Sequence, residues 1–596
     1  MCPSPERGTP RNFSIYMDSF TPPPQKKKKF IDKLFSKVHA LRASDAFILK
    51  SVLLVTFVFL LIFLIQLSQK FSIAVATEGG TFTEGIVGTP RFINPVLAVT
   101  RADKDLTTLI YDGLMVLGKE GSLVPSVAES ITVSEDGLTY NVILKNNITF
   151  HDGTPLKAAD VAFTVGRIQD PLLASPLRMS FDGIVLEEVG EYELNFILPE
   201  PYAPFMQNLT FGILPQHIWK DAGTEEFPFS QYNSEPVGSG PYQIKSIVRN
   251  ASGIPEKYIL KTNTAYHTQA PKIEFVELDF FPTDEKLVEA FTNGDIDSVV
   301  GIDEAYVEKL ALNPETHHLE RIPLPRTFAL FINQNKSPAL RDNDARRALS
   351  VAIDRTALIG ATLGGYGNPL TSPIPPGFGI KDDRVEIPTG NINEARDILK
   401  KAGWKLNEET QIWEKTIDGT LTPLSFSIAT ANSSVFETTA EFLRNTWKEV
   451  GAEVSIKQFE QSDLTQSVIR PRDYETLLFG TQLGRSLDFY SFWHSSQRND
   501  PGLNIALYAN ITTDSILGDM RRTSDPAVFG EAISKFAKEV EKETPAIFLY
   551  APELLYVFPN HIMNATFNGI SEPRERWNGI ENWYIKTESV WPFFTK

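Results

Sequence analysis

The chain has 596 residues, several times the length of an ordinary domain, so we expect two or three lobes. Apolar residues make up 42% and charged residues 22% of the chain, a balance typical of folded globular proteins. The net charge of −17 argues against nucleic acid as a partner, because binding to phosphates relies on a basic surface.

The N-terminal end joins a basic segment to an apolar one. Residues 1–50 carry ten Lys or Arg against four acids, and the 19 residues 51–69 carry no charge. This is about the length that crosses a bilayer as a helix, and Lys50 and Lys70 can reach the two interfaces. By the positive-inside rule we predict a single-pass protein of the plasma (inner) membrane, with residues 1–50 in the cytoplasm and the body outside.

A cleaved signal peptide is the competing interpretation, because Ala74-Val75-Ala76 has the small-x-small form of a cleavage site. The apolar run is long for a signal peptide, and the segment before it has about 50 residues. We therefore favour an uncleaved anchor, followed by a linker at residues 70–77. Both interpretations export the body.

The body is predicted to begin with a β-hairpin and a helix. In Ile131–Phe150 apolar residues alternate with polar ones on both sides of Asp136-Gly137, which supplies the turn. Residues Ala158–Ile168 are predicted to be helical, with Asp160 in the first turn, where the helix dipole favours a negative charge.

Later segments alternate between helices and strands. Apolar residues three and four positions apart predict helices over Asp342–Leu358, Asn393–Ala402 and Ser434–Val450. The last helix is predicted to stop at Gly451, and Glu453–Phe459 is predicted to be a strand. Helices followed by short loops and strands are typical of an α/β fold.

The sequence lacks the common motifs of catalytic and metal sites. It contains no H-E-x-x-H, no G-x-S-x-G elbow and no G-x-x-x-x-G-K-[ST], so we expect that the chain is not its own ATPase. Its single cysteine, Cys2, allows neither a zinc cluster nor an intramolecular disulfide. We therefore predict no catalytic residue, no metal ligand and no cofactor.

One block of residues carries a family resemblance. It runs through Ala128–Ser130, Ser134–Tyr140, Phe150–Leu156 and Asp160-Val161. This block resembles the signature of family 5 extracellular solute-binding proteins, the oligopeptide- and dipeptide-binding receptors of ABC importers. The resemblance covers roughly residues 80–590, and further segments follow in the family's order at Pro236–Tyr242, Arg347–Arg355 and Ala395–Trp404.

The resemblance implies a three-lobed, type II periplasmic-binding-protein-like body after the transmembrane helix. The implied bounds are residues 78–111, 187–325 and 545–596 for lobe I, 112–186 for lobe II and 326–544 for lobe III. It also implies that hinge closure traps the ligand between lobes I and III. In the family's peptide binders, backbone groups of cleft strands pair with the peptide as an added strand.

The chain departs from these peptide binders at one position. They carry an Asp in the third lobe that anchors the α-ammonium group of the peptide, and Gly484 stands at the matching place here. Asp488 is the nearest acid. Arg485 either favours an acidic or carboxylate group on the ligand or is simply solvated.

Six residues are predicted to contact the ligand because of their places in the family pattern. They are Thr481, Gln482, Asp488 and Trp493 from one third-lobe segment, Phe328 from the segment that enters that lobe, and Arg91 near the first strand.

The predicted function is that of an extracytoplasmic receptor and not of an enzyme. Its expected partners are a peptide ligand, the membrane through one helix, and an ABC permease and ATPase on separate chains. Two alternatives stay open. One is a receptor for a non-peptide solute, such as a metal chelate or a saccharide, and the other is a membrane-anchored hydrolase with an unrecognised site.

Overall fold

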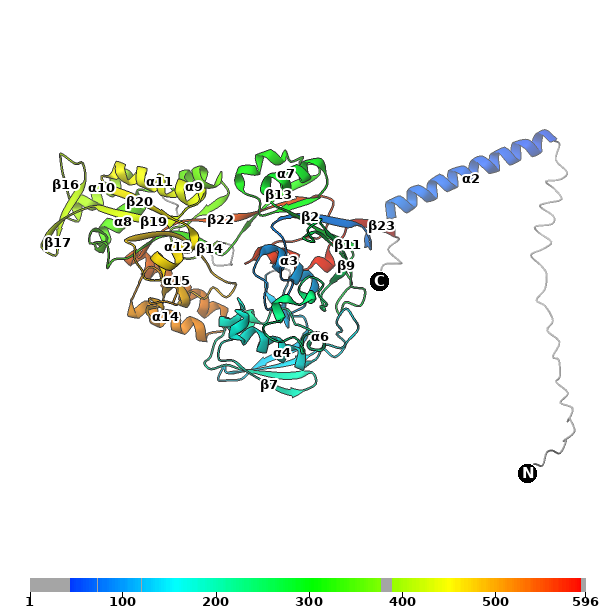
Figure 1. Ribbon diagram of the computed structural model, residues 1–596. Helices are drawn as coiled ribbons and strands as arrows, with labels where there is room; N and C mark the ends of the chain where they lie inside the picture. The colour runs from blue at the N-terminus through cyan, green and yellow to red at the C-terminus, as the bar shows by residue number, and fades with distance from the viewer. Residues whose placement is uncertain (1–42, 72, 119–120, 377–388, 591–596) are drawn as a thin grey trace, which may run out of the picture. The chain divides into compact units, whose positions relative to one another are not determined.

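The described part of the chain forms two compact units. The computed structural model describes residues 43–71, 73–118, 121–376 and 389–590 (Figure 1). One unit comprises residues 1–75 with 588–596, and the other comprises residues 76–587. Most of the predicted basic head therefore lies outside the described residues.

The smaller unit contains the predicted membrane helix. Helix α2 (Ala43–Phe71) has 29 residues, and its stretch Phe47–Leu64 is long and apolar enough to cross a membrane. None of this stretch is buried, and Phe59 is 68% exposed. A helix that is apolar all round and unburied suits a lipid environment, as a signal sequence or an anchor does. Spanning itself remains a prediction.

A twelve-stranded mixed sheet organises the larger unit. Ten strands follow the order β20-β19-β21-β14-β22-β12-β2-β11-β10-β9, and β13 and β15 also pair with β22. Their bounds are β2 Thr81–Val87, β9 Tyr242–Arg249, β10 Pro255–Thr262, β11 Phe275–Phe281, β12 Ser298–Val300, β13 His317–Pro323, β14 Arg326–Ile332, β15 Gly367–Pro369, β19 Ser425–Ala431, β20 Glu453–Phe459, β21 Thr476–Gln482 and β22 Ala546–Pro559.

Strand β22 joins two differently packed halves of this unit. Its first residues pair with β14, as in Ile547 with Leu330, and its last residues pair with β13, as in Val557 with Leu319. Tyr550 belongs to a hydrophobic core built from residues 330–550, whereas Leu554 belongs to one built largely from residues 82–324. We call residues 326–551 the third lobe, and residues 76–324 with 554–587 the major half.

The chain passes between these halves at two places only within the larger unit. One is the connection from β13 to β14 around Pro325, and the other lies inside β22 near Pro552. The predicted boundary at residue 325 lies at the first of these connections. The predicted boundary at 544–545 falls short of the second, because Ala546 and Phe548 pack in a core of the third lobe.

The third lobe is an α/β layer with a core on each face of its sheet. Alternate residues of β14 face opposite ways, since Leu330 and Ile332 lie in one core and Ala329 and Phe331 in the other. One core is covered by α8 (Asn343–Val351), α9 (Arg355–Leu363), α10 (Ile392–Lys401) and α11 (Ser434–Val450), and the other by α14 (Ile511–Arg522) and α15 (Pro526–Glu543) (Figure 1).

Two of the three helices predicted in this lobe are confirmed and one is corrected. Helices α10 and α11 occupy the predicted ranges, and α11 begins at the cap Ser433 and ends at Gly451, which has a positive φ of 109°. The predicted helix over Asp342–Leu358 is wrong, because the chain breaks between α8 and α9. Asp354 caps α9, and the break lets the buried Arg355 donate to the carbonyl oxygens of Leu370 and Phe548.

The predicted hairpin and the helix after it are confirmed in the major half. Strands β5 (Ala128–Val133) and β6 (Thr139–Leu144) pair in an antiparallel manner, and α4 (Ala158–Gln169) follows. The sheet continues in the order β5-β6-β8-β7 through β7 (Val185–Gly190) and β8 (Glu193–Ile197), so it extends past the predicted end of lobe II at residue 186.

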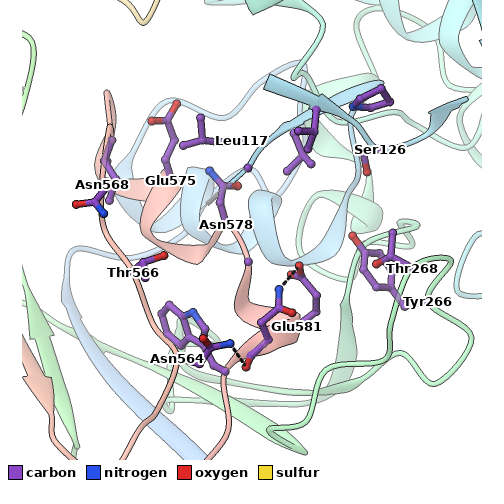
Figure 2. Close-up of a pocket in the computed structure, with 18 residues that line it drawn as sticks. Leu117, Ser126, Tyr266, Thr268, Asn564, Thr566, Asn568, Glu575, Asn578 and Glu581 are labelled. Carbon is purple, nitrogen blue, oxygen red and sulfur yellow. Dashed lines mark hydrogen bonds between the residues drawn. The ribbon is translucent and has the colours of Figure 1, made fainter. Parts of the chain in front are cut away.

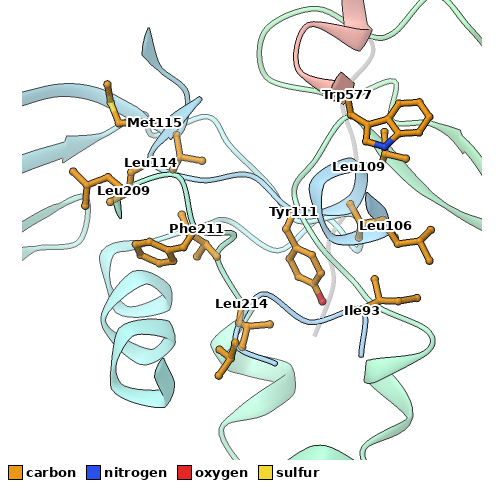
Figure 3. Close-up of a cluster of buried hydrophobic side chains, with 14 of the residues drawn as sticks. Ile93, Leu106, Leu109, Tyr111, Leu114, Met115, Leu209, Phe211, Leu214 and Trp577 are labelled. Carbon is orange, nitrogen blue, oxygen red and sulfur yellow. The ribbon is translucent and has the colours of Figure 1, made fainter. Parts of the chain in front are cut away.

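Lobes I and II, predicted as separate, share one hydrophobic cluster. Leu106 and Leu109 of α3 (Arg101–Ile110) pack in the same cluster as Leu114, Leu209 and Phe211 (Figure 3). The two predicted lobes therefore behave as one packed body against which the third lobe is set.

The remaining helices and strands are short or peripheral. They are β1 Ile73–Thr77, β3 Met115–Leu117, β4 Leu123–Pro125, α5 Phe205–Asn208, α6 Gln216–Trp219, α7 Asp284–Asn293, β16 Lys405–Leu406, β17 Trp413–Ile417, β18 Thr420–Pro423, α12 Gln461–Asp463, α13 Tyr490–Trp493, the 3-10 helix η10 Pro573–Trp577 and β23 Lys586–Val590.

Candidate ligand-binding site

A cavity lies where the first residue of β14 and the last residue of β21 meet the major half. These two residues, Arg326 and Gln482, are register partners in the sheet. The cavity has a volume of about 230 Å³. Its walls are Val99, Arg101, Lys104 and Asp105 at the start of α3, Glu572, Pro573 and Arg574 at η10, and Arg326 and Gln482 from the third lobe.

The start of α3 is held firmly against this cavity. Thr100 caps the helix, and its side chain and that of Asp103 form a reciprocal capping box. Asp103 Oδ1 also accepts hydrogen bonds from the backbone N–H groups of Arg91 and Phe92, at 2.6 and 2.8 Å. The loop after β2 and the first turn of α3 are thus fixed as one piece.

Glu572 gathers two of the cavity's cations. Its carboxylate accepts from Lys104 Nζ at 3.2 Å and from Arg574 Nε at 2.9 Å. Burial raises the pKa of Glu572, but the charges and hydrogen bonds of Arg574 and Lys104 outweigh that effect and lower the pKa to about 2. Glu572 therefore stays ionised throughout the physiological range, and it neutralises part of the positive charge around it.

The other two cations form no ion pair with a carboxylate of the described residues. Arg101 Nη1 donates to the carbonyl oxygen of Val300 at 2.9 Å, and burial lowers the pKa of this guanidinium. The Arg326 side chain has no hydrogen-bond or ion-pair partner among the residues that the structure describes. Burial and the charge of Arg101 lower the pKa of Arg326, and Glu572 opposes them.

Beneath the cavity lies a closed ion cluster. The guanidinium group of Arg576 donates to both oxygens of Asp105 at 2.7 Å and also pairs with Glu84. All three side chains are 0% exposed. Because all three side chains are buried and paired with one another, this cluster supports α3 and η10 and does not offer a group to a ligand.

Two further polar contacts bridge the third lobe to the major half. Asp488 holds Arg521 with Nη2–Oδ2 at 2.6 Å, and the Tyr202 hydroxyl donates to Asp488 at 3.4 Å. Nearby, the backbone N–H of Ala203 donates to the carbonyl of Arg521 at 2.8 Å. The carboxylate of Asp488 is thus already paired with a cation, which leaves it poorly suited to replace the anchoring Asp of the peptide receptors.

Arg485 makes the second bridge. It donates to the carbonyl of Gly121 at 3.2 Å and pairs with Glu575 of η10. Its side chain is 11% exposed, so it is neither solvated nor free to meet a carboxylate on a ligand in this conformation.

The six predicted contact residues do not come together. Gln482 lies in the cavity, and Thr481 beside it is partly buried. Phe328 stacks on Tyr550 at 5.2 Å between ring centroids, against a core of the third lobe. Trp493 is 5% exposed, in the lobe's other core.

Arg91 contributes to the site through its backbone. Its side chain is exposed and lies over the ring of Phe92 at 4.8 Å.

The cations of the cavity were not predicted from the sequence, because charged residues without a motif are most often solvated. The one available signal was the position of Arg326, which is the first residue of β14 and directly follows the predicted lobe boundary.

A second cavity lies wholly within the major half. It has a volume of about 190 Å³ and lies between β3–β4 and residues 564–583 (Figure 2). Amide and hydroxyl side chains line it, including Asn564, Asn568, Asn578 and Tyr266. Because the third lobe contributes nothing to its wall, movement of that lobe does not build or dismantle it.

Comparisons with known proteins identify relatives over most of the chain. The profile of bacterial extracellular solute-binding proteins, family 5 middle region, matches residues 122–502. The oligopeptide-binding protein AppA of Bacillus subtilis is 27% identical over 538 residues, which cover 87% of this chain and 94% of AppA.

Solved structures share the fold. AppA of Bacillus subtilis in complex with a nonapeptide superposes with a TM-score of 0.64 at 24% identity, covering 86% of this chain and 100% of that one. NikZ of Campylobacter jejuni in complex with Ni(L-His) has a TM-score of 0.64 at 22% identity, covering 85% and 99%.

Proposed function

Since the chain belongs to family 5 of the bacterial extracellular solute-binding proteins, which serve ABC importers, we propose that it binds peptides outside the cytoplasm and delivers them to an importer. The permease and the ATPase of that importer are separate chains. The protein acts by binding and release and catalyses no reaction.

The composition of the cavity wall carries this proposal. Arg326 and Gln482 come from the third lobe, whereas Lys104 and Glu572 come from the major half. The backbone connects the two halves at the β13–β14 connection and within β22, and the other contacts between them are non-covalent. Rotation about these two connections opens and closes the cavity, which is how a hinged receptor traps a solute.

Peptides are favoured over other solutes by two arguments. AppA, an oligopeptide-binding protein, matches this chain along 94% of its own length. The cavity wall also carries Arg326, which forms no ion pair in the described residues, and every peptide with a free C-terminus carries a carboxylate group. A solute without an anionic group does not meet this cation.

We further propose that helix α2 anchors the receptor in the membrane. Its apolar stretch Phe47–Leu64 has the required length, and the basic residues before it favour a cytoplasmic N-terminus. An anchor keeps the receptor near its permease and raises the effective concentration there. Uptake by a variant lacking residues 1–70 tests this role, and equal uptake by that variant contradicts it.

Mass spectrometry of the molecules released from purified residues 78–596 by denaturation tests the ligand class. A mixture of short peptides is the expected result. A single non-peptide solute, such as a metal chelate or a saccharide, would replace the peptide assignment. Turnover of added peptides by the purified protein would favour the anchored hydrolase instead.

A further inference from the structure

More cations than carboxylates line the wall of the interlobe cavity. Five cations, namely Arg101, Lys104, Arg326, Arg574 and Arg576, lie at or just beneath its wall with the three carboxylates Glu84, Asp105 and Glu572. This local excess stands in a chain whose net charge is −17.

Each of these three carboxylates is already paired with a cation. Glu84 and Asp105 are both bound by Arg576, and Glu572 is shared by Lys104 and Arg574. Arg101 is directed to backbone carbonyls, the nearer being that of Val300. Outside the gaps at 119–120 and 377–388, nothing in the larger unit pairs with the guanidinium of Arg326.

Arg326 is nevertheless held in place. Its backbone N–H donates to the carbonyl of Leu324 at 2.7 Å, and the N–H of Leu483 donates to the carbonyl of the preceding Pro325 at 2.9 Å. Its partner across the ladder, Gln482, adds an exposed amide to the same wall. An arginine whose backbone is held in place beside an amide donor can offer N–H groups to the two oxygens of a carboxylate.

The free-energy cost of an unpaired Arg326 also favours the binding of an anionic group. A guanidinium that is partly withdrawn from water favours an anionic partner, and the charge of Arg101 acts on Arg326 more strongly than the opposing charge of Glu572. An anionic group placed between these two cations relieves both the desolvation and the repulsion.

We propose that the cavity is a carboxylate subsite in which Arg326 and Gln482 of the third lobe receive an anionic group of the ligand, so that the receptor selects acidic solutes. This inference rests on the proposed function, because it names the chemistry that the same receptor requires of its ligand. The cavity, at about 230 Å³, is smaller than a site for a whole drug-sized ligand, so it holds one end of the ligand.

The anionic group binds the third lobe while Lys104, Arg101 and Arg574 approach from the major half. A ligand carboxylate thus attracts both walls of the cavity and favours the closed arrangement over the open one. A neutral ligand end lacks this effect, and closure on it leaves like charges facing each other.

Two sources of carboxylate are distinguished by a matched set of peptides. The probes are alanine peptides with a free C-terminus, the same peptides amidated, and amidated peptides that carry one internal glutamate. Binding is measured by titration calorimetry on the full chain in detergent at low and at physiological ionic strength. The variants are Arg326→Gln and, as a control of equal charge change on the exposed face of the same lobe, Arg444→Gln.

Free-acid peptides are expected to bind the wild-type chain about tenfold to a hundredfold more tightly than amidated ones, the range for a lost charge-assisted hydrogen bond. Arg326→Gln removes this preference, and Arg444→Gln keeps it. Recovery of affinity by the internal glutamate assigns the subsite to acidic side chains, whereas failure to recover assigns it to the C-terminal carboxylate.

Equal binding of free-acid and amidated peptides by the wild-type chain overturns the subsite while leaving the peptide receptor intact. If no peptide binds but acetate or citrate binds in an Arg326-dependent manner, the subsite stands and the peptide function fails. If neither peptides nor these carboxylates bind, both fail. The wild-type comparison of acid with amide needs no variant, so a folding defect in Arg326→Gln does not shield the proposal.

Discussion

Two guanidinium groups near helix α3 differ in whether the fold pairs them with carboxylates. Arg576 is fully buried and pairs with Glu84 and Asp105, whereas Arg326 at the cavity wall has no such partner in the described ranges. Arg576 is fully withdrawn from water and Arg326 only partly, and only Arg576 is paired with carboxylates of the fold. A compensated charge holds elements together, and an uncompensated one at a cavity is available to a ligand.

The largest expected effect comes from breaking the compensated cluster. Arg576→Met leaves Glu84 and Asp105 buried without their cation, and we expect the free energy of unfolding to fall by about 3–5 kcal/mol. Denaturant unfolding of residues 78–596 measures this. Arg444→Met, which removes an exposed arginine paired within its own helix, should cost less than about 0.5 kcal/mol. Equal stability of the two variants would show that Arg576 does not hold the fold.

Glu572 is the intermediate case, because it is partly exposed and shared by Lys104 and Arg574. Its folded-state pKa of about 2 lies below the ordinary value of 4.5, so its stabilisation is fully present above pH 4.5 and is lost as the pH falls towards 2. We expect Glu572→Gln to cost about 2 kcal/mol at neutral pH, with this difference shrinking below pH 4.5. A difference that is constant from pH 7 to pH 3 would contradict the assigned charge.

Removing Arg326 should have the opposite sign in the ligand-free protein. Arg326→Met replaces a partly desolvated, unpaired cation by an apolar side chain, and we expect stability to stay the same or rise by up to about 1 kcal/mol. The same unfolding assay, run without ligand, decides this. A loss comparable to that of Arg576→Met would mean that Arg326 has a structural partner, and the contrast between the two arginines would disappear.

The smallest expected effect concerns the bridge between the halves. Tyr202→Phe removes a hydroxyl that donates to Asp488 at 3.4 Å, while the Asp488–Arg521 ion pair remains. We expect a loss of stability below about 0.5 kcal/mol. Asp488→Asn serves as the companion variant, and it should cost more because it weakens the pairing of Arg521. A larger loss for Tyr202→Phe would reverse this ranking.

Local patterns predicted local elements well. The hairpin around Asp136-Gly137, helix α4 and helix α11 followed from period-two and period-3.6 spacing together with turn and cap residues. The exception was the helix predicted over residues 342–358, where the apolar stripe continues across a break. Its spacing did not reveal that Asp354 starts a new helix or that Arg355 is buried.

Features built from segments far apart in the chain could not be predicted from these local patterns. The second lobe's sheet extends through Ile197, and the third lobe's core extends through Ala551, because strands far apart in sequence pair there. The cavity joins side chains from residues 99–105, 326, 482 and 572–574. No periodicity links these segments, so the sequence indicated the lobe boundary near Arg326 but not the charges that meet it.

The most direct test of hinged trapping is a distance across the two halves. The single cysteine, Cys2, can be replaced by serine, and spin labels can then be attached through cysteines at the exposed positions Val189 in the major half and Val528 in the third lobe. Pulsed electron paramagnetic resonance gives the distance distribution with and without alanine peptides that have free C-termini. A receptor that closes on its ligand predicts a shift to one shorter, narrower distribution on adding peptide. An unchanged distribution at saturating peptide would contradict closure as the mode of binding.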